Sequence, residues 1–328
     1  MIDASDNILE VDKLITCFET DRGLLRAVDQ VSFVVPAGKT VGIVGESGCG
    51  KSVTAMSIVR LLPQPAGKIL GGRVLFQGHD LVHASNAEMR RVRGGEIGVI
   101  FQEPMAALNP VQRIGRQVAE AFRLHQKISK RDAWLAATEM LELVRIPAPT
   151  LRMMDYPHHL SGGMRQRIVI ALALACRPAL VIADEPTTAL DVTVQAQILE
   201  LIASLQREFK MSMILITHDL GVIAETCDEV VVMYAGRVVE RASAKDLFAH
   251  PLHAYTKGLL HSIPTLATPS KSLLNTIPGM VASLADHTHG CRFCQRLGRS
   301  STALRDRPGF AEVAPGHWVE TCPLCYQP

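Results

Sequence analysis

The sequence has few aromatic residues, almost no net charge and no long apolar run. Aromatic side chains make up 5% of the 328 residues, and 34 Lys and Arg residues oppose 32 Asp and Glu residues, for a formal net charge of +2. No basic stripe with interleaved aromatic residues occurs, so the sequence gives no electrostatic reason to expect a nucleic-acid partner. The longest apolar stretch, 168–176, is much shorter than the ~20 residues that span a bilayer.

Targeting signals, repeats and low-complexity segments are also missing. Residues 1–6 are acidic and are followed by no apolar segment of the kind found in secretory signals, so we expect a protein kept in the cytoplasm. If it works at a membrane, we expect a peripheral subunit. The length suits one large domain with an appendage.

A glycine-rich run with the spacing GxxxxGK[ST] is the first informative motif. Such a loop lets several backbone N–H groups converge on a phosphate at the start of a helix. An apolar strand expected over 40–44 precedes it, and a helix expected over 52–62 follows it. Its lysine adds a positive charge and its serine a hydroxyl for Mg²⁺. The nucleotide-binding residues predicted here are Gly45, Glu46, Ser47, Gly48, Cys49, Gly50, Lys51, Ser52 and Val53.

An apolar run over 180–183 ends in two carboxylates, Asp184 and Glu185. Such a run is typical of a strand buried on both faces of a parallel sheet, and ligands bind beyond the carboxyl ends of those strands. We expect Asp184 to hold Mg²⁺ and Glu185 to accept a proton from the attacking water. Two carboxylates that merely solvate a strand end are the alternative, which the accompanying phosphate loop disfavours.

A second glycine-opened helix start, Ser161-Gly162-Gly163, precedes a helix expected over 164–176. Its free N–H groups lie at the positive end of the helix. Since a single ATP does not need two such starts, the pair predicts a dimer that sandwiches ATP. His218 follows another apolar strand, 213–216, and we expect it at the same sheet edge as Glu185, where it can hydrogen-bond the γ-phosphate.

These motifs, in this order, resemble the ATP-binding cassette (ABC) ATPases over about residues 8–250. The resemblance implies an α/β fold: a P-loop NTPase cassette with a RecA-like parallel sheet core, an antiparallel β layer and a helical subdomain over about 103–178. It is carried by Phe18, the phosphate loop, Gln102-Glu103-Pro104, Leu160-Ser161-Gly162-Gly163-Met164, Asp184-Glu185, Ala189-Leu190-Asp191 and Thr217-His218-Asp219.

The resemblance also implies roles for residues outside the phosphate loop. Phe18 would stack on adenine, although a lone aromatic residue in a strand can equally be core. Gln102 would ligate Mg²⁺, orient water and face a membrane partner. Ser161, Gly162 and Gly163 would grip the γ-phosphate held by the opposite subunit. Asp191 would cross the dimer interface and couple the two ATP sites.

The tail resembles the C-terminal extension of the dipeptide, oligopeptide and nickel importer ATPases. This resemblance rests on the run 250–260 (HPLHAYTKGLL), on Ile277-Pro278-Gly279 and on 290–294 (GCRFC). We therefore expect a cassette over 1–250 and an importer-type extension over 251–328. The implied function is ATP hydrolysis that drives import of a peptide-class solute, at the cytoplasmic face of the inner membrane.

The implied partners are two membrane permease subunits, a second ATPase subunit and, indirectly, an extracytoplasmic solute-binding protein. A related paralogue is favoured as the second ATPase, and a homodimer is possible. Nickel, metallophore and glutathione-type solutes remain open. A soluble cassette ATPase acting on chromosomes or ribosomes would need a coiled-coil insertion or a second cassette, and an exporter would normally carry fused membrane helices. The sequence has none of these.

Four of the eight cysteines form the pairs Cys291-x-x-Cys294 and Cys322-x-x-Cys325. This spacing suits a tetrahedral thiolate site, and a cytoplasmic location disfavours disulfides. A [4Fe-4S] cluster, which the family resemblance implies, and Zn²⁺ are the two candidates, with free thiols as the alternative. Cys17, Cys176 and Cys227 are expected in the core, and Cys49 at a helix start is expected to have a lowered thiol pKa.

Overall fold

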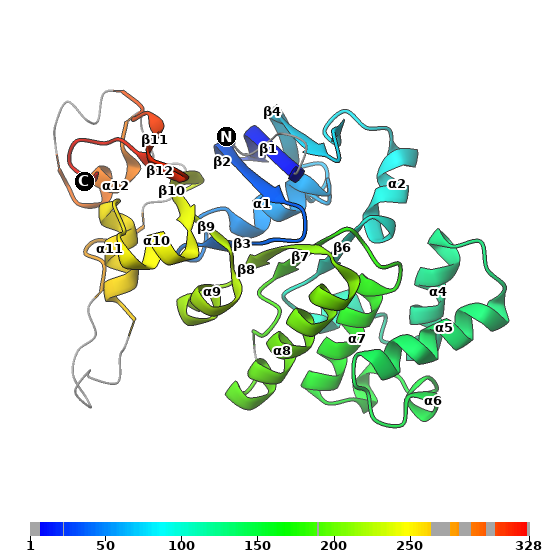
Figure 1. Cartoon of the computed structure of the whole chain (residues 1–328). Coiled ribbons are helices and arrows are strands. Elements are labelled where there is room, and N and C mark those ends of the chain that lie inside the picture. Colours follow the sequence, from blue (N-terminus) through cyan, green and yellow to red (C-terminus); the bar gives the residue numbers. More distant parts are fainter. Residues whose placement is uncertain are drawn as a thin grey trace. The chain divides into compact units, whose positions relative to one another are not determined.

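The computed structural model describes residues 7–21, 23–188, 190–263, 276–281, 290–299 and 306–326 (Figure 1). The acidic residues 1–6, which bear on the targeting prediction, lie outside these ranges. The chain divides into two compact units. Unit 1 contains 1–8, 35–39 and 83–216, and unit 2 contains 9–34, 40–82 and 217–328.

Unit 1 is built on three parallel strands, β6 (Ile97–Ile100), β7 (Leu180–Asp184) and β8 (Ser212–Ile216). Strand β7 lies in the middle, with Ala183 opposite both Ile100 and Leu215. Every residue of β7 and β8 is buried, as their continuous apolar runs predict. The carboxyl end of β7 therefore carries Asp184 to one edge of this sheet.

The helices of unit 1 have amphipathic or apolar faces that pack within the unit. For example, Val118 and Phe122 of α4 and Ala133 and Ala137 of α5 are buried, and the two helices lie together with α6 in Figure 1. The helices are α2 (Asn86–Gly95), α3 (Pro104–Ala107), α4 (Ile114–His125), α5 (Lys130–Leu143), α6 (Pro149–Arg152), η1 (Pro157–His159), α7 (Gly162–Leu174) and α8 (Val192–Phe209).

Unit 2 contains most of an antiparallel sheet in the order β2-β1-β4-β5 and a second strand group in the order β11-β12-β10-β9-β3. The first sheet consists of β1 (Asn7–Thr20), β2 (Gly23–Pro36), β4 (Gly67–Phe76) and β5 (His79–Asp80). The second group consists of β3 (Thr40–Val44), β9 (Glu229–Tyr234), β10 (Arg237–Ser243), β11 (Phe310–Ala314) and β12 (His317–Glu320). Strands β3 and β9 are parallel, whereas β9, β10, β12 and β11 pair antiparallel.

The C-terminal region is integrated into unit 2 through strand pairing. Strand β12 pairs with β10, where Val319 lies opposite Glu240. Backbone hydrogen bonds therefore join the end of the chain to the strand that follows β9. The helices of unit 2 are α1 (Lys51–Ile58), α9 (Leu220–Thr226), α10 (Ala244–Ala249), α11 (Ala254–His261) and α12 (Arg292–Arg296).

Three predictions of local structure need correction. Helix α1 ends at Ile58 instead of residue 62, because Arg60 adopts a left-handed conformation with φ 52° that a helix cannot continue through. Helix α7 begins at Gly162, two residues earlier than expected, because Ser161 caps it. Cys17 and Cys227 are buried as predicted, but Cys176 is only half-buried.

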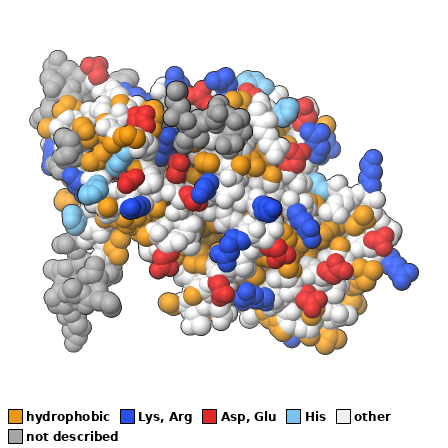
Figure 2. Space-filling model, in the orientation of Figure 1, with side chains coloured by type: hydrophobic (Ala, Val, Ile, Leu, Met, Phe, Trp, Pro, Cys, Tyr) orange, Lys and Arg blue, Asp and Glu red, His pale blue; other side chains and the backbone are white. Residues whose placement is uncertain are grey.

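The surface and the helices agree with the composition. Figure 2 shows Lys and Arg side chains interspersed with Asp and Glu on the visible face, with apolar side chains scattered between them. In the part of the chain that the structure describes, no helix is both long enough and apolar enough to cross a membrane.

Candidate functional site

The phosphate loop connects β3 to α1 in unit 2. The Lys51 side chain is buried at 6% exposure, and its Nζ lies 2.8 Å from the Gly45 carbonyl and 3.1 Å from the Glu46 carbonyl. The ammonium is thus held against the loop's own backbone. A cation held in this way is ready to meet a phosphate at the start of α1.

Two glycines of the loop are required by its backbone. Gly45 has φ 150°, and a Cβ placed there would lie 2.2 Å from the Met233 carbonyl oxygen. Gly50 has φ 103°, and its Cβ would lie 2.6 Å from the Ala27 carbonyl oxygen. Both positions combine a conformation that favours glycine with a close backbone approach, so the motif's spacing has a steric cause.

Cys49 does not behave as the sequence suggested. Its side chain is 1% exposed, and burial raises the pKa of the thiol despite the nearby Lys51 ammonium. The prediction of a lowered pKa was wrong, because the cost of burying a thiolate exceeds the stabilisation from the helix start and the lysine. Cys49 is a small packed residue of the loop.

Strand β7 of unit 1 ends, as predicted, at the two carboxylates. Asp184 is the last residue of β7 and is 3% exposed, and Glu185 follows it. Gln102 Nε2 donates a hydrogen bond to Glu185 Oε2 over 2.9 Å, and Thr188 Oγ1 donates to the same oxygen over 2.8 Å. The glutamine and the glutamate, 83 positions apart in the chain, are therefore brought together.

Glu185 has a strained backbone for a residue with a side chain. Its φ is 46°, in the left-handed region, and its N–H donates to the Ile216 carbonyl over 2.9 Å. Backbone strain of this kind is retained where the surrounding structure overdetermines it, and it clusters at functional sites. The turn aims the carboxylate toward Gln102 and Thr188.

Ser161 and Asp191 both cap helices of unit 1. The Ser161 side chain accepts from the Met164 N–H over 3.4 Å at the start of α7, and Gly162 is exposed. The Asp191 side chain accepts from the Val194 N–H over 3.0 Å at the start of α8 and is itself exposed. Each residue thus has a structural task, and both remain accessible to a partner.

Phe18 and His218 belong to unit 2. Phe18 is half-buried in β1, opposite Gly67 of β4. His218 follows β8 in the chain and is exposed.

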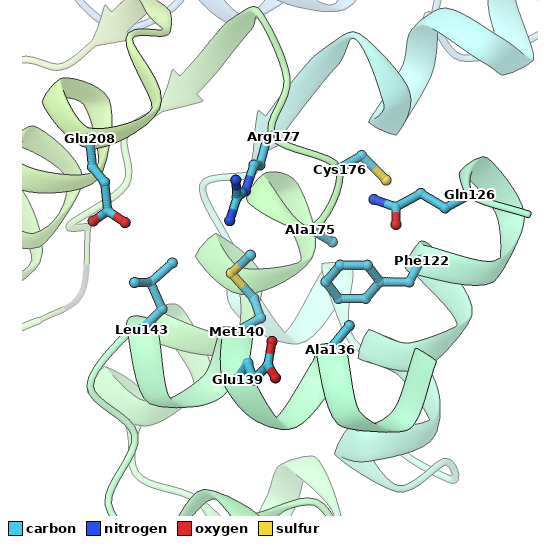
Figure 3. Close-up of a pocket in the computed structure, with 10 residues that line it drawn as sticks. All are labelled: Phe122, Gln126, Ala136, Glu139, Met140, Leu143, Ala175, Cys176, Arg177 and Glu208. Atoms are coloured by element: carbon cyan, nitrogen blue, oxygen red, sulfur yellow. The ribbon is translucent and has the colours of Figure 1, made fainter. Parts of the chain in front are cut away.

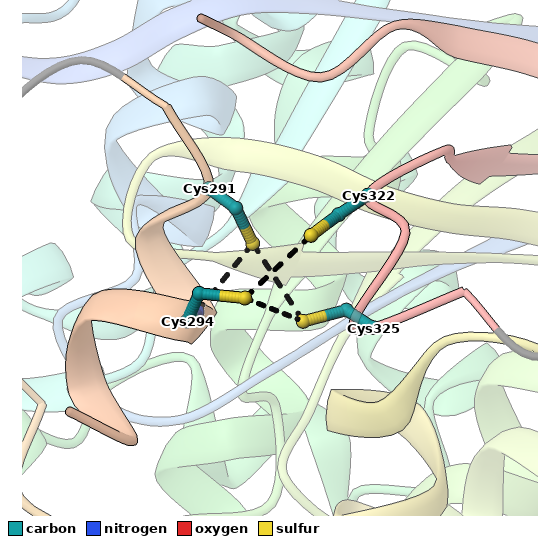
Figure 4. Close-up of side chains that lie close together, drawn as sticks. All are labelled: Cys291, Cys294, Cys322 and Cys325. Atoms are coloured by element: carbon teal, nitrogen blue, oxygen red, sulfur yellow. Dashed lines mark hydrogen bonds between the residues drawn. The ribbon is translucent and has the colours of Figure 1, made fainter. Parts of the chain in front are cut away.

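The four cysteines of the two CxxC pairs converge in unit 2. Cys291 caps α12 and Cys294 lies in it, whereas Cys322 and Cys325 follow β12, and the sulfur atoms point toward one another (Figure 4). All four side chains are fully buried, and their sulfur atoms lie within 4.8 Å of one another. Neighbouring sulfur atoms are 3.3 to 3.7 Å apart.

This donor set fits a metal centre. A zinc ion with Zn–S bonds of about 2.3 Å requires sulfur separations of about 3.8 Å, close to those observed. The hydrogen bond with Cys325 lowers the pKa of Cys291 to about 5, whereas burial raises the pKa of Cys294 to about 12. Four buried thiolates repel one another, so a cation is needed to hold all of them ionised.

Sequence reasoning missed two residues that reach the phosphate loop. The Tyr255 hydroxyl accepts a hydrogen bond from the Glu46 N–H over 2.9 Å, and Arg296 Nη1 donates to Glu46 Oε2 over 2.6 Å. Tyr255 lies in the run HPLHAYT, and Arg296 comes two residues after Cys294. No local pattern indicates either contact.

Unit 1 contains a cavity of about 440 Å³ (Figure 3). It contains Cys176, which explains the partial exposure of that side chain, and none of the predicted site residues. Its lining consists of Phe122, Gln126, Ala136, Glu139, Met140, Leu143, Ala175, Cys176, Arg177 and Glu208.

Known proteins resemble the chain over nearly its whole length. Residues 28–188 match the ABC transporter family, and 239–300 match the oligopeptide/dipeptide transporter C-terminal region. A probable peptide ABC transporter ATP-binding protein of Sinorhizobium fredii is 52% identical over 95% of this chain and 94% of its own length. The oligopeptide transport ATP-binding protein OppD of Bacillus subtilis is 49% identical over 96% and 88%.

Solved structures agree on the fold. The dimeric ATP-binding cassette MJ0796, bound to ADP and phosphate, has a TM-score of 0.65 and 25% identity over 72% of this chain and 98% of its own. The cassette cbiO1 of Clostridium perfringens has a TM-score of 0.63 and 27% identity over 75% and 92%. These neighbours confirm the predicted α/β cassette fold. The chain therefore belongs to the ATP-binding ATPases of ABC transporters, in the oligopeptide/dipeptide group of that family.

Proposed function

We propose that this ATPase drives the import of a di- or oligopeptide through two membrane permease subunits, as a peripheral subunit at the cytoplasmic face of the inner membrane. The observation that carries the proposal is the hydrogen bond between Gln102 and Glu185, which joins the expected partner-facing residue to the expected general base. The peptide transport named for its relatives supports the choice of solute.

The phosphate loop binds ATP in this proposal. Lys51 neutralises phosphate charge, and the N–H groups that follow Glu46 contact the phosphate oxygens. Ser52, Asp184 and Gln102 hold Mg²⁺. Phe18 stacks on the adenine ring, for which its position in β1 leaves one part of the side chain accessible.

Hydrolysis uses the carboxylate at the end of β7. Glu185 accepts a proton from the attacking water, and His218 hydrogen-bonds the γ-phosphate. Gln102 and Thr188 both donate to Glu185 Oε2. Their hydrogen bonds orient the base before the water arrives.

A second ATPase subunit completes the site, since cassettes of this family form dimers such as that of MJ0796. Ser161, Gly162 and Gly163 present the start of α7 to the γ-phosphate held by the partner, and Asp191 lies at the same interface. Exposure of Ser161, Gly162 and Asp191 is what such a contact requires. A related paralogue is the favoured partner, and an extracytoplasmic binding protein delivers the solute to the permeases.

The four cysteines hold a metal centre, either a four-iron, four-sulfur cluster or Zn²⁺. When bound, it crosslinks the α12 segment to the segment that follows β12 and neutralises the four thiolates. Cys291 and Cys294 supply two ligands and Cys322 and Cys325 the other two. No residue of the proposed hydrolytic machinery belongs to this set.

Uptake in cells tests the proposal. A strain that lacks the gene is complemented with the parent chain or with Glu185→Gln, and uptake of a labelled dipeptide, a labelled pentapeptide and ⁶³Ni²⁺ is measured. Restoration of peptide uptake by the parent chain alone supports the proposal. Restoration of nickel uptake without peptide uptake assigns the metal alternative, and uptake restored by Glu185→Gln removes ATP hydrolysis at this residue from the transport step.

A further inference from the structure

Glu46, the second residue of the phosphate loop, is held at all three of its polar groups. Its N–H donates to the Tyr255 hydroxyl over 2.9 Å, and its carboxylate accepts from Arg296 over 2.6 Å. Its carbonyl accepts from Lys51 Nζ over 3.1 Å. The lysine expected to meet phosphate therefore rests on a residue whose position is set by two side chains from the C-terminal region.

From these contacts we infer that Tyr255 and Arg296 are positioning residues, which fix the phosphate loop in its nucleotide-binding conformation. The inference rests on the proposed role of this loop in binding ATP. It makes the affinity for nucleotide depend on the C-terminal region, although that region contributes no atom to the proposed nucleotide site.

The geometry of Arg296 suits this role. Its side chain is 4% exposed, so its charge needs a partner, and its interactions leave it one fixed position. Nε donates to the Pro278 carbonyl over 2.9 Å and Nη2 to the Ile277 carbonyl over 3.1 Å, while Nη1 reaches Glu46. Three donors in a rigid fork thereby fix the direction in which the guanidinium meets the loop.

Tyr255 is fixed equally well. It is fully buried, and its ring packs against Tyr234 and Phe293 with centroid distances of 4.6 and 5.5 Å. Phe293 lies between Cys291 and Cys294 in the chain. The tyrosine hydroxyl is thus presented to the Glu46 N–H by an aromatic cluster that includes a residue of the cysteine motif.

A second route joins the cysteine motif to the loop through the turn after β9. Arg292 donates to the Ala235 carbonyl and, through Nη2, to Asp29 over 2.8 Å. The next residue of the turn, Gly236, donates its N–H to the Cys49 carbonyl over 2.8 Å. Glu46 is therefore linked directly to Arg296, and Cys49 is linked through the turn after β9 to Arg292.

Because these contacts order the phosphate loop in advance, they should strengthen nucleotide binding. A loop that is already ordered loses less conformational freedom when nucleotide binds, so its affinity is higher. Removal of the Arg296 contact should raise the Kd for Mg-ATP by roughly tenfold, the scale of one charge-assisted hydrogen bond. The kcat at saturating ATP should stay close to the parent value, because Glu185 and Gln102 lie outside this network.

The test measures the Kd of Mg-ATP, kcat, metal content and thermal unfolding for Arg296→Ala, Arg296→Lys and Tyr255→Phe in the full chain. Arg299→Ala is the matched control, since Arg299 follows the same helix and binds the Leu324 carbonyl, not the loop. We expect weaker binding in Arg296→Ala and Tyr255→Phe, partial recovery in Arg296→Lys and no change in Arg299→Ala. Tyr255→Phe removes a single oxygen and decides the question if Arg296→Ala does not fold or loses metal.

A double-mutant cycle with Glu46→Gln sharpens the result. If Arg296 acts through Glu46, its substitution adds little in the Glu46→Gln background. Unchanged affinity in Tyr255→Phe and Arg296→Ala, or additive effects in the cycle, would overturn the inference. Lys51→Ala separates this outcome from failure of the proposed function, because ATP binding that survives Lys51→Ala would mean that the loop is not the nucleotide site.

Discussion

The phosphate loop and the cysteine cluster are two small sites in the same compact unit, but they are assembled in different ways. The loop is one contiguous run whose shape is determined mainly by its own backbone conformation, with Gly45 and Gly50 at positive φ. The cluster draws two pairs of side chains from segments 28 positions apart, Cys294 to Cys322, and depends on their folding together. A local motif can be recognised by its spacing, whereas a side-chain cluster exists only if the intervening chain returns to the same place.

The two sites also differ in what surrounds them. Tyr255 and Arg296 tie the loop to the C-terminal region, whereas all four cysteines of the cluster belong to that region themselves. We therefore expect substitutions in the nucleotide residues to affect turnover strongly, and substitutions in the cluster to affect metal content and the order of the tail.

The largest effect is expected at Glu185. Glu185→Gln removes the general base but keeps the size of the side chain, so kcat for ATP hydrolysis should fall by at least ~10²-fold while Mg-ATP binding is retained. Phosphate release and nucleotide binding are measured in parallel. Glu225→Gln, an exposed residue of α9, serves as control and should hydrolyse ATP at the parent rate. Turnover at the parent rate in Glu185→Gln would remove this residue from the role.

A second substitution tests the helix start Ser161-Gly162-Gly163. A Cβ at Gly162 would lie at an ordinary 3.5 Å from the Leu190 side chain, its nearest neighbour among the described residues, so Gly162→Asp should fold. Its carboxylate would oppose the partner's γ-phosphate and weaken ATP-dependent dimerisation by about tenfold or more, while binding of ATP to the single chain persists. Gly162→Asn is the neutral control of the same size. An equal loss of ATP binding by the monomeric chain would show that the loop acts in cis.

Cys322→Ser addresses the cluster. Removal of one of four ligands should abolish stoichiometric metal and make the C-terminal region sensitive to limited proteolysis, while most of the parent kcat remains at saturating ATP. Cys176→Ser, outside the cluster, is the control. Anaerobically purified parent protein identifies the metal: a brown colour with iron and labile sulfide indicates the cluster, and a colourless protein with one zinc indicates the ion. If the purified protein contains neither iron nor zinc in stoichiometric amount, the proposed metal centre is contradicted.

The smallest effect concerns His253, which caps α11 by accepting from the Tyr255 N–H over 3.2 Å. Burial lowers the pKa of His253 to about 3, from 6.5 for an exposed imidazole. Between these values the unfolded chain binds a proton that the folded chain does not, so stability rises with pH in this window, by up to about 1.4 kcal/mol per unit.

His253→Asn retains a capping side chain without a titratable ring. The difference in unfolding free energy between parent and variant, measured by denaturant titration from pH 5 to 8, should shrink below pH 6.5 and stay constant above it. A difference that is independent of pH throughout would mean that the pKa of His253 is the same in the folded and the unfolded chain.

Much of this protein follows from its sequence alone. The continuous apolar runs of β3, β7 and β8 predict buried strands, because such strands have no solvent-facing side. The spacing of Gly45 to Ser52 predicts a phosphate loop, because the glycine positions follow from backbone geometry within the loop itself. The paired CxxC spacing also predicts a thiolate site from local geometry, because two cysteines separated by two residues share one turn. The division into a cassette over 1–250 and an extension over 251–328 stays a prediction.

Only the tertiary structure decided which groups from distant segments come into contact. The buried environment of Cys49 reversed the expected direction of its thiol pKa, because burial depends on neighbours that a local motif does not specify. The contact of Gln102 with Glu185 depends on the pairing of β6 with β7. The contacts of Tyr255 and Arg296 with Glu46 depend on folding that brings α11 and α12 to the phosphate loop. Local sequence determines which groups a segment can offer, whereas only the folded chain determines which groups meet and how far water is excluded from them.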